Sequence, residues 1–191
     1  QGARGLILGL RSNPGGLLNS AVEVAGAFLP PGEVIVTTRG RRGENVNRTT
    51  EPATVDWPLV VLQNRDSASA SEILAGALQD YHRAVVVGEA SIGKGSVQTI
   101  FQVGESGLRL TTARYYLPSG RTIQDTGVQP DITVALTTAE RAVSWARGGH
   151  QELSDEAFVE RFGIPRPPDR QLDAARAILT GLLAMEPVAA N

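Results

Sequence analysis

Apolar residues along this chain fall into short continuous runs separated by longer periodic stretches, a pattern that predicts strands alternating with helices. Three short runs, at 5–10, 58–62 and 83–88, are bounded by turn residues and favour strands. Between them, apolar residues recur at helical spacing over 17–28 and 72–78. Strand, helix, strand units of this kind form right-handed crossovers and bring their loops together at the carboxyl ends of the strands.

The rest of the pattern adds β-structure and a helical C-terminus. Further strands are predicted at 33–38, 97–101 and 108–116, and the polar stretch 39–50 indicates a hairpin or a mobile loop. Three helices are predicted after Thr138, at 139–145, 155–162 and 169–185. We therefore expect a mixed α/β fold, with a core at 1–137 and a helical segment at 138–191.

Composition narrows the function classes. The 191 residues are 41% hydrophobic with a formal net charge of −2, which gives no electrostatic reason to expect nucleic acid as a partner. The basic cluster of Arg39, Arg41 and Arg42 is interpreted as a solvated hairpin tip. The chain has no cysteine, which excludes disulfides, thiolate catalysis and cysteine-based zinc sites. Because the sequence opens with Gln1 and has no initial Met, we expect the protein's true N-terminus to lie upstream.

The candidate chemistry lies where the 58–62 strand meets the following helix. Three alternating serines, Ser67, Ser69 and Ser71, occupy this junction, and free N–H groups at the start of the helix face whatever lies above it. Lys94 follows the 83–88 strand and is flanked by glycines. A serine can attack an amide when a base and an oxyanion site lie nearby. The pattern alone does not separate the three serines, and a serine before a helix is also a typical N-cap.

Together with Ser12-Asn13-Pro14-Gly15-Gly16, these segments resemble the C-terminal processing peptidases, or tail-specific proteases, which use a serine and a lysine instead of a Ser-His-Asp triad. The resemblance runs from about residue 5 to residue 132. It implies six site residues: Ser69 as nucleophile, Lys94 as general base, Gln98 orienting the lysine, Gly15 and Ala70 as oxyanion donors, and Asp80 in support. Glu72 also matches an acidic position of the family, and both acids have an alternative interpretation as capping or helix-face charges.

The resemblance also implies the wider properties of the protein. These are a ClpP/crotonase-like β-α-β core, preceded in the whole protein by a PDZ domain and the first core elements, and a serine endopeptidase activity that cleaves proteins near their C-termini through an acyl-enzyme. They include an extracytoplasmic location (periplasm or cell envelope). From the residues we expect no cofactor or metal, and two interpretations of the apolar stripe at 172–183: oligomerisation through the C-terminal helices, or packing on the chain's own core, which we favour. The alternative is a catalytically inactive peptide- or ligand-binding module of the same fold, since Gly9 stands where members of the family usually have Asp.

The roles implied for Lys94 and Gln98 each require a particular geometry. A lysine acts as a base only when it is neutral, so we expect Lys94 to be buried, and a contact with the nearby Glu89 would keep it charged. Gln98 would lie about 13 Å from Lys94 along an extended strand, so its role requires a turn between them.

Two other site classes are weighed and set aside. Residues 88–94 fit the first seven positions of a phosphate-binding loop, but Gly95 stands where that motif needs Ser or Thr. The two histidines, His82 and His150, give no conventional triad, because a continuous helix would separate His82 from Ser69 by roughly 20 Å. We interpret both as surface residues.

Overall fold

A four-stranded parallel sheet organises the fold. The structure is a computed structural model that describes residues 2–138, 140–141 and 153–185. The sheet has the order β1-β4-β5-β8 and consists of β1 (Leu6–Gly9), β4 (Leu59–Gln63), β5 (Val85–Gly88) and β8 (Ile132–Thr133). The three predicted apolar runs supply β1, β4 and β5, which pair in parallel. β4 is buried throughout and β5 almost throughout, whereas β1 is half-buried.

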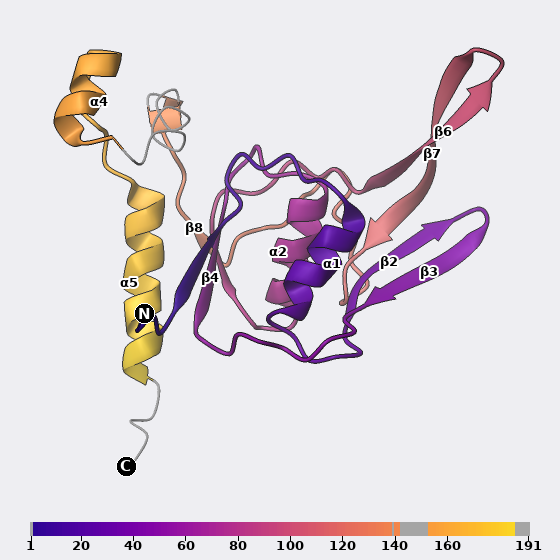
Figure 1. Cartoon of the computed structure of the whole chain (residues 1–191), viewed down its shortest axis with the longest axis horizontal. Coiled ribbons are helices and arrows are strands. Elements are labelled where there is room, and N and C mark those ends of the chain that lie inside the picture. Colours follow the sequence, from indigo (N-terminus) through magenta and orange to yellow (C-terminus); the bar gives the residue numbers. More distant parts are fainter. Residues whose placement is uncertain (1, 139, 142–152, 186–191) are drawn as a thin grey trace.

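Helices cover both faces of this sheet (Figure 1). On one face, α1 (Leu18–Gly26) and α2 (Ala70–Asp80) pack in one apolar cluster with Val61 and Val86. On the other face, α5 (Arg170–Met185) packs with Val60, Leu62 and Val87. Alternating side chains along each strand point to opposite faces, which gives the sheet these two apolar layers. The apolar stripe of α5 thus packs on the chain's own core, through Leu172, Ala175, Ile178, Leu179 and Leu182.

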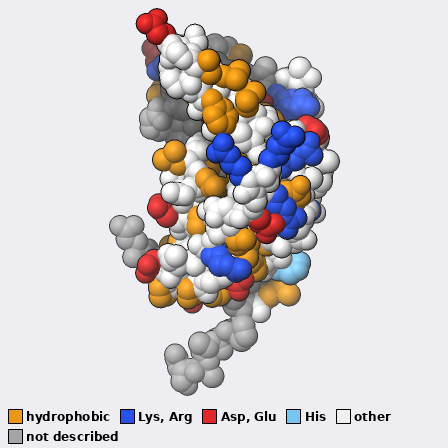
Figure 2. Space-filling view, turned by 90° about the vertical axis from the view of Figure 1, so that its right-hand side faces the viewer, with side chains coloured by type: hydrophobic (Ala, Val, Ile, Leu, Met, Phe, Trp, Pro, Cys, Tyr) orange, Lys and Arg blue, Asp and Glu red, His pale blue; other side chains and the backbone are white. Residues whose placement is uncertain are grey.

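A second, antiparallel sheet consists of two hairpins that extend away from the helices (Figure 1). Its order is β3-β2-β7-β6, with strands β2 (Val34–Gly40), β3 (Gly43–Arg48), β6 (Ser96–Val103) and β7 (Ser106–Tyr116). The 39–50 stretch is therefore a hairpin, with Arg41 and Arg42 in its turn. Figure 2 faces this side of the molecule and shows apolar and basic side chains exposed next to one another. The exposed apolar residues of the longer hairpin are Ile100, Val103, Leu108 and Leu110.

The C-terminal part contains α4 (Asp155–Phe162) and α5. Phe158 of α4 is fully buried, and Ser154 caps this helix by accepting a hydrogen bond from the Ala157 N–H. The helix predicted at 139–145 lies mostly outside the described residues, as does His150. None of the helices in the described ranges has the length and apolar character that crossing a membrane requires.

The carboxyl ends of β1, β4 and β5 meet at one edge of the parallel sheet. Each strand there continues into a loop, at residues 10–17, 64–69 and 89–95. These loops hold the three sequence blocks that carry the family resemblance, as the parallel topology predicts.

Candidate active site

Ser69 lies in the sharp turn between β4 and α2. Its backbone has φ 57° and ψ −118°, a conformation that is sparsely populated for a residue with a side chain and is often found at functional sites. Ser69 is partly exposed, whereas Ser67 and Ser71 are buried. The Ser67 hydroxyl donates to the Leu10 carbonyl at 2.7 Å and accepts from the Asn64 N–H at 3.0 Å. Exposure therefore separates the three serines, and it favours Ser69 as the reactive one.

Gly15 lies directly against this turn. A Cβ atom on Gly15 would stand 2.7 Å from the Ala68 carbonyl oxygen and 2.8 Å from the Ala70 nitrogen, and φ at Gly15 is +93°. Ala70 is the first residue of α2, so its N–H has no acceptor within the helix. The Gly15 N–H donates to Asn13 Oδ1 at 2.9 Å, so it is bonded within its own loop. The structure thus brings the two predicted oxyanion donors together beside Ser69.

Glu72 joins the start of α2 to the loop after β5. Its side chain is fully buried and accepts four hydrogen bonds from neutral groups. Oε2 accepts from the backbone N–H groups of Ser69, at 2.7 Å, and Lys94, at 2.9 Å. Oε1 accepts from the Ser91 hydroxyl at 2.6 Å and the Gly93 N–H at 2.7 Å. The bond from the Ser69 N–H is a capping-box contact and confirms the interpretation of Glu72 as a capping charge. The bonds from the loop after β5 are not predicted from the sequence.

The shared carboxylate oxygen brings the backbones of Ser69 and Lys94 together. Because both nitrogens bond to the same oxygen, at 2.7 and 2.9 Å, they lie close to each other. A further bond between the Ile92 N–H and the Ser67 carbonyl, at 3.0 Å, connects the same two loops. The two blocks that the sequence separates by 25 positions are therefore neighbours in space.

The Lys94 side chain is exposed, so the prediction that it is buried is wrong for this structure. The physical reason lies in the loop: its backbone N–H groups turn inward to Glu72, which leaves the side chain of residue 94 on the outer side. Glu89 does not need a lysine partner, because its carboxylate pairs with Arg141 at 2.7 Å.

The same contacts exclude a phosphate-binding loop at 88–94. The N–H groups of Gly93 and Lys94, which would have to face a phosphate, donate to Glu72 instead. The loop continues into β6, whereas a phosphate-binding loop opens a helix. Among the described residues, no group of three or more His, Asp or Glu side chains is placed to hold a metal ion.

Gln98 lies within β6, after a bulge between Val97 and Gln98. Its Nε2 donates to Thr111 Oγ1 of β7 at 2.6 Å, and its side chain is exposed. The structure therefore places Gln98 on the longer hairpin, where it bonds to a neighbouring strand.

Asp80 lies at the opposite end of α2 from Ser69, and a helix of 11 residues spans about 16 Å. Its carboxylate pairs with Arg121 at 2.9 Å and accepts from the Ser119 N–H at 2.9 Å. The structure thus uses Asp80 to anchor the 119–121 turn and does not bring it next to Ser69. His82 follows the same far end of the helix and is exposed.

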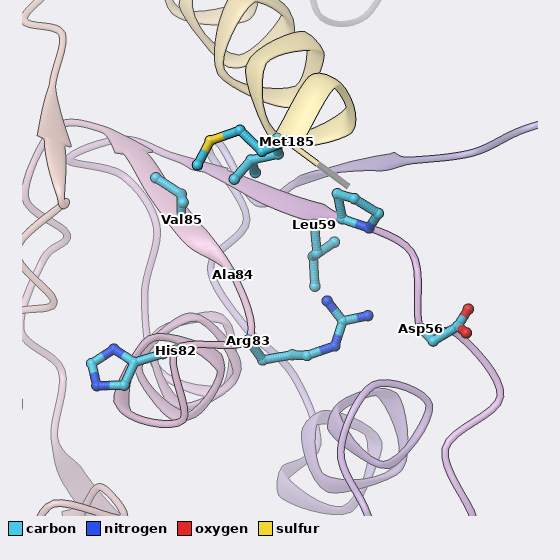
Figure 3. A pocket seen from close by; sticks show the side chains of 9 residues that line it. Asp56, Leu59, His82, Arg83, Ala84, Val85 and Met185 are labelled. Atoms are coloured by element: carbon cyan, nitrogen blue, oxygen red, sulfur yellow. The ribbon is translucent and has the colours of Figure 1, made fainter. Parts of the chain in front are cut away.

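A hollow of about 380 Å³ lies away from the loops at 10–17, 64–69 and 89–95 (Figure 3). Leu59, Ala84 and Val85 line it at the amino ends of β4 and β5, and Met185 borders it from the end of α5. Arg83 is held there through its donors to the carbonyls of Val55 and Trp57. Because Ser69 stands at the carboxyl edge of the sheet, this hollow is not part of the candidate active site.

A family model, related sequences and a solved structure all relate this chain to the same kind of protein. A model of peptidase family S41 matches residues 1–134. The carboxy-terminal-processing protease of Bartonella bacilliformis is 48% identical over 195 residues, covering 93% of this chain and 44% of the relative. The chloroplastic carboxyl-terminal-processing peptidase 3 of Arabidopsis thaliana is 44% identical over 135 residues, covering 69% of this chain and 26% of the relative. The solved structure of the photosystem II D1 C-terminal processing protease superposes with a TM-score of 0.64 at 39% identity, covering 70% of this chain and 35% of that one. The chain spans less than half the length of these relatives.

Proposed function

The chain belongs to peptidase family S41, and we propose that it carries the acyl-transfer machinery of a serine endopeptidase that cleaves proteins near their C-termini. Family membership confirms the resemblance seen in the sequence and implies protein substrates. The observation that carries the proposal is the carboxylate oxygen of Glu72, which holds the backbones of Ser69 and Lys94 together. The names of the relatives support cleavage near the C-terminus.

The mechanism follows the placement of the groups. Ser69 Oγ attacks the carbonyl carbon of the scissile bond while the neutral Lys94 amine accepts the hydroxyl proton. The N–H groups of Gly15 and Ala70 stabilise the oxyanion, after Asn13 Oδ1 gives up its bond to Gly15. The protonated lysine then delivers its proton to the leaving amine, and water hydrolyses the acyl-enzyme by the reverse sequence.

The exposed Lys94 side chain must be shielded from water before it can act. We propose that an extended protein substrate covers it, with main-chain hydrogen bonds along a sheet edge near the loop. The same exposure favours the second candidate function, a peptide-binding module without turnover, because a lysine left in water stays charged. In this proposal Gln98 and Asp80 take no part in the chemical steps, because their side chains bond to Thr111 and Arg121.

Labelling with a fluorophosphonate separates the two functions. In the full-length protein, the probe should modify Ser69, and Ser69→Ala should abolish the added mass. Lys94→Ala should slow labelling by about 100-fold or more, the usual contribution of a general base. Ser106→Ala, at the exposed first residue of β7, is the matched control. A folded wild-type protein that binds peptides but takes up no probe would be the binding module, and undiminished labelling of Lys94→Ala would remove the lysine from the mechanism.

Lys94 is the only lysine within residues 1–191, which allows a chemical test as well. Acetic anhydride should acetylate this side chain among the amines of the full-length protein, and the loss of probe labelling should follow the acetylation of Lys94, measured on the peptide that contains it. Labelling that continues at the original rate after complete acetylation of Lys94 would contradict its role as the base.

We also propose that the parent protein acts outside the cytoplasm, as the family resemblance implies. The support is indirect, because the Arabidopsis relative is named chloroplastic. Fractionation of cells that produce the full-length protein tests this location.

A further inference from the structure

The first turn of α5 contacts the loop that follows β1. Asp169, which is 8% exposed, precedes this helix and caps it by accepting the Leu172 N–H at 3.0 Å. The same carboxylate accepts both terminal nitrogens of Arg11, at 2.7 and 3.0 Å. Paired bonds of this kind fix a guanidinium in position and direction, which a single contact does not.

A second side chain of the same turn supports this contact. Gln171 is fully buried, and its Nε2 donates to the Val134 carbonyl at 2.9 Å, directly after β8. Its Oε1 accepts a longer bond from Arg11, at 3.4 Å. The start of α5 is therefore tied to the carboxyl edge of the sheet, where the catalytic loops lie.

Arg11 begins the segment that ends at Gly15. Beyond Arg11, the Ser12 N–H donates to Asn64 Oδ1 at 2.7 Å, with φ at Ser12 of 55°. The Asn13 carbonyl then accepts the Ala68 N–H at 3.0 Å, one residue before Ser69. The segment is short and its backbone is strained, so its position depends on the groups that hold it from both sides.

We propose that Asp169 is a positioning residue for the oxyanion site: through Arg11 it sets the position of residues 11–15, and hence of the Gly15 N–H relative to Ser69. This inference rests on the proposed peptidase function. Asp169 acts through Arg11, to which its carboxylate is bonded. The C-terminal helix thereby contributes to catalysis through its first turn, in addition to covering the sheet with its apolar side.

The two roles of α5 are separable. Its apolar side chains pack against Val60, Leu62 and Val87, and these contacts remain when the charge of Asp169 is removed. Asp169→Asn keeps an oxygen for the helix cap but loses the paired acceptor of Arg11. The helix should therefore stay docked while the 11–15 segment gains freedom.

The test compares Asp169→Asn with Asp173→Asn in the full-length protein. Asp173 lies on the same helix and makes an exposed, longer contact of 3.8 Å with Arg176, so it controls for lost charge. Asp169→Asn should slow fluorophosphonate labelling of Ser69 by about 10- to 100-fold, because a misplacement of about 1 Å has effects of this order. Asp173→Asn should label at the wild-type rate.

Three further measurements separate positioning from general stability. Affinity for a peptide boronic acid, which forms a tetrahedral adduct, should fall in Asp169→Asn, while affinity for the matching peptide amide should not. Arg11→Lys should reproduce the loss, and the double variant should be no slower than either single variant. Amide hydrogen exchange should rise in residues 12–16 of Asp169→Asn and not in Asp173→Asn.

Each contrary outcome overturns the inference. Wild-type labelling in a folded Asp169→Asn protein would remove the role, and so would an equal weakening of boronic acid and amide binding. If the wild-type protein takes up no probe, the proposed peptidase function fails on its own, and the exchange measurement then decides whether Asp169 holds the segment.

Discussion

The two ends of α2 each carry a carboxylate that ties the helix to a distant loop, and they do so in different ways. At the start, Glu72 is fully buried and accepts bonds from neutral donors, including the backbones of Ser69 and Lys94. At the end, Asp80, whose side chain is 9% exposed, pairs with Arg121, whose side chain is 38% exposed. One carboxylate assembles the candidate active site, and the other anchors a surface turn.

The helix dipole explains the difference. Backbone N–H groups at the start of a helix favour a negative charge, so Glu72 can be stabilised there by dipoles alone. At the other end, carbonyl groups disfavour an anion, and Asp80 needs a cation as its partner. A carboxylate held by neutral donors needs no cation of its own beside Ser69, where one would compete with Lys94. We therefore expect the two acids to differ sharply when each is neutralised.

Glu72→Gln against Asp80→Asn tests this comparison most strongly. In either orientation, the amide that replaces the Glu72 carboxylate turns its NH₂ group toward two donors, so buried hydrogen bonds are lost. We expect the free energy of unfolding to fall by about 2–4 kcal/mol and labelling of Ser69 to slow about 1,000-fold. Asp80→Asn should reduce stability by about 1–2 kcal/mol, with labelling unchanged, because its carboxylate is mostly buried while its partner Arg121 is partly exposed.

Urea unfolding and the rate of fluorophosphonate labelling measure the two effects separately. If Asp80→Asn slowed labelling as much as Glu72→Gln, the supporting role that the family resemblance implies for Asp80 would be restored. The distinction between the two ends of α2 would then be lost.

Gly15→Ala disturbs the same end of α2 from outside the helix. The new Cβ would meet backbone atoms of Ala68 and Ala70 at 2.7–2.8 Å, and φ at this position is +93°. We expect about 1–3 kcal/mol of lost stability and labelling about 100-fold slower, because the loop must move away from Ser69. Gly16→Ala is the matched control, since nothing lies within 4 Å of its Cβ position. Equal behaviour of the two variants would show that Gly15 has no part in the oxyanion site.

The sequence predicts the framework of the fold well and the site only in part. The apolar runs identify β1, β4 and β5 because both faces of these strands pack against apolar layers, most completely in β4, and this leaves a continuous apolar signal. The apolar stripe of α5 is equally clear, and its packing on the sheet is confirmed. Ser69 is chosen among three serines through the family spacing, and the structure adds the exposure that distinguishes it.

Two features of the site depend on backbone geometry that residue types do not reveal. The partners of Glu72 include the N–H groups of Gly93 and Lys94, and a backbone donor carries no signature in the sequence. The outward direction of the Lys94 side chain follows from the same inward-facing N–H groups, so neighbouring glycines could not predict it. Long-range pairing by main-chain groups is therefore the part of this site that pattern analysis misses.

The smallest expected effect lies at the far end of α2, at Tyr81, the residue that caps the helix. Its hydroxyl donates to the Val34 carbonyl of β2 at 3.0 Å. Burial, together with the nearby Glu33 carboxylate, raises the pKa of Tyr81 from 10.0 to about 12. The folded protein thus keeps this proton at a pH where the unfolded chain loses it, so the contribution of Tyr81 to stability is complete below pH 10 and is lost as the pH rises toward 12.

Tyr81→Phe should therefore unfold about 1 kcal/mol more easily than wild type at pH 8, through the lost hydrogen bond. Above pH 10, the difference in the free energy of unfolding between wild type and Tyr81→Phe should shrink by at most about 1.4 kcal/mol per pH unit. Only the wild-type protein loses the Tyr81 contribution there. Both proteins should still become less stable, since burial also raises the pKa of Tyr115. Urea unfolding between pH 8 and pH 11.5 measures this. A difference that stays constant over that range would contradict the Tyr81 assignment, and slower labelling at pH 8 would show that the far end of α2 does reach the catalytic loops.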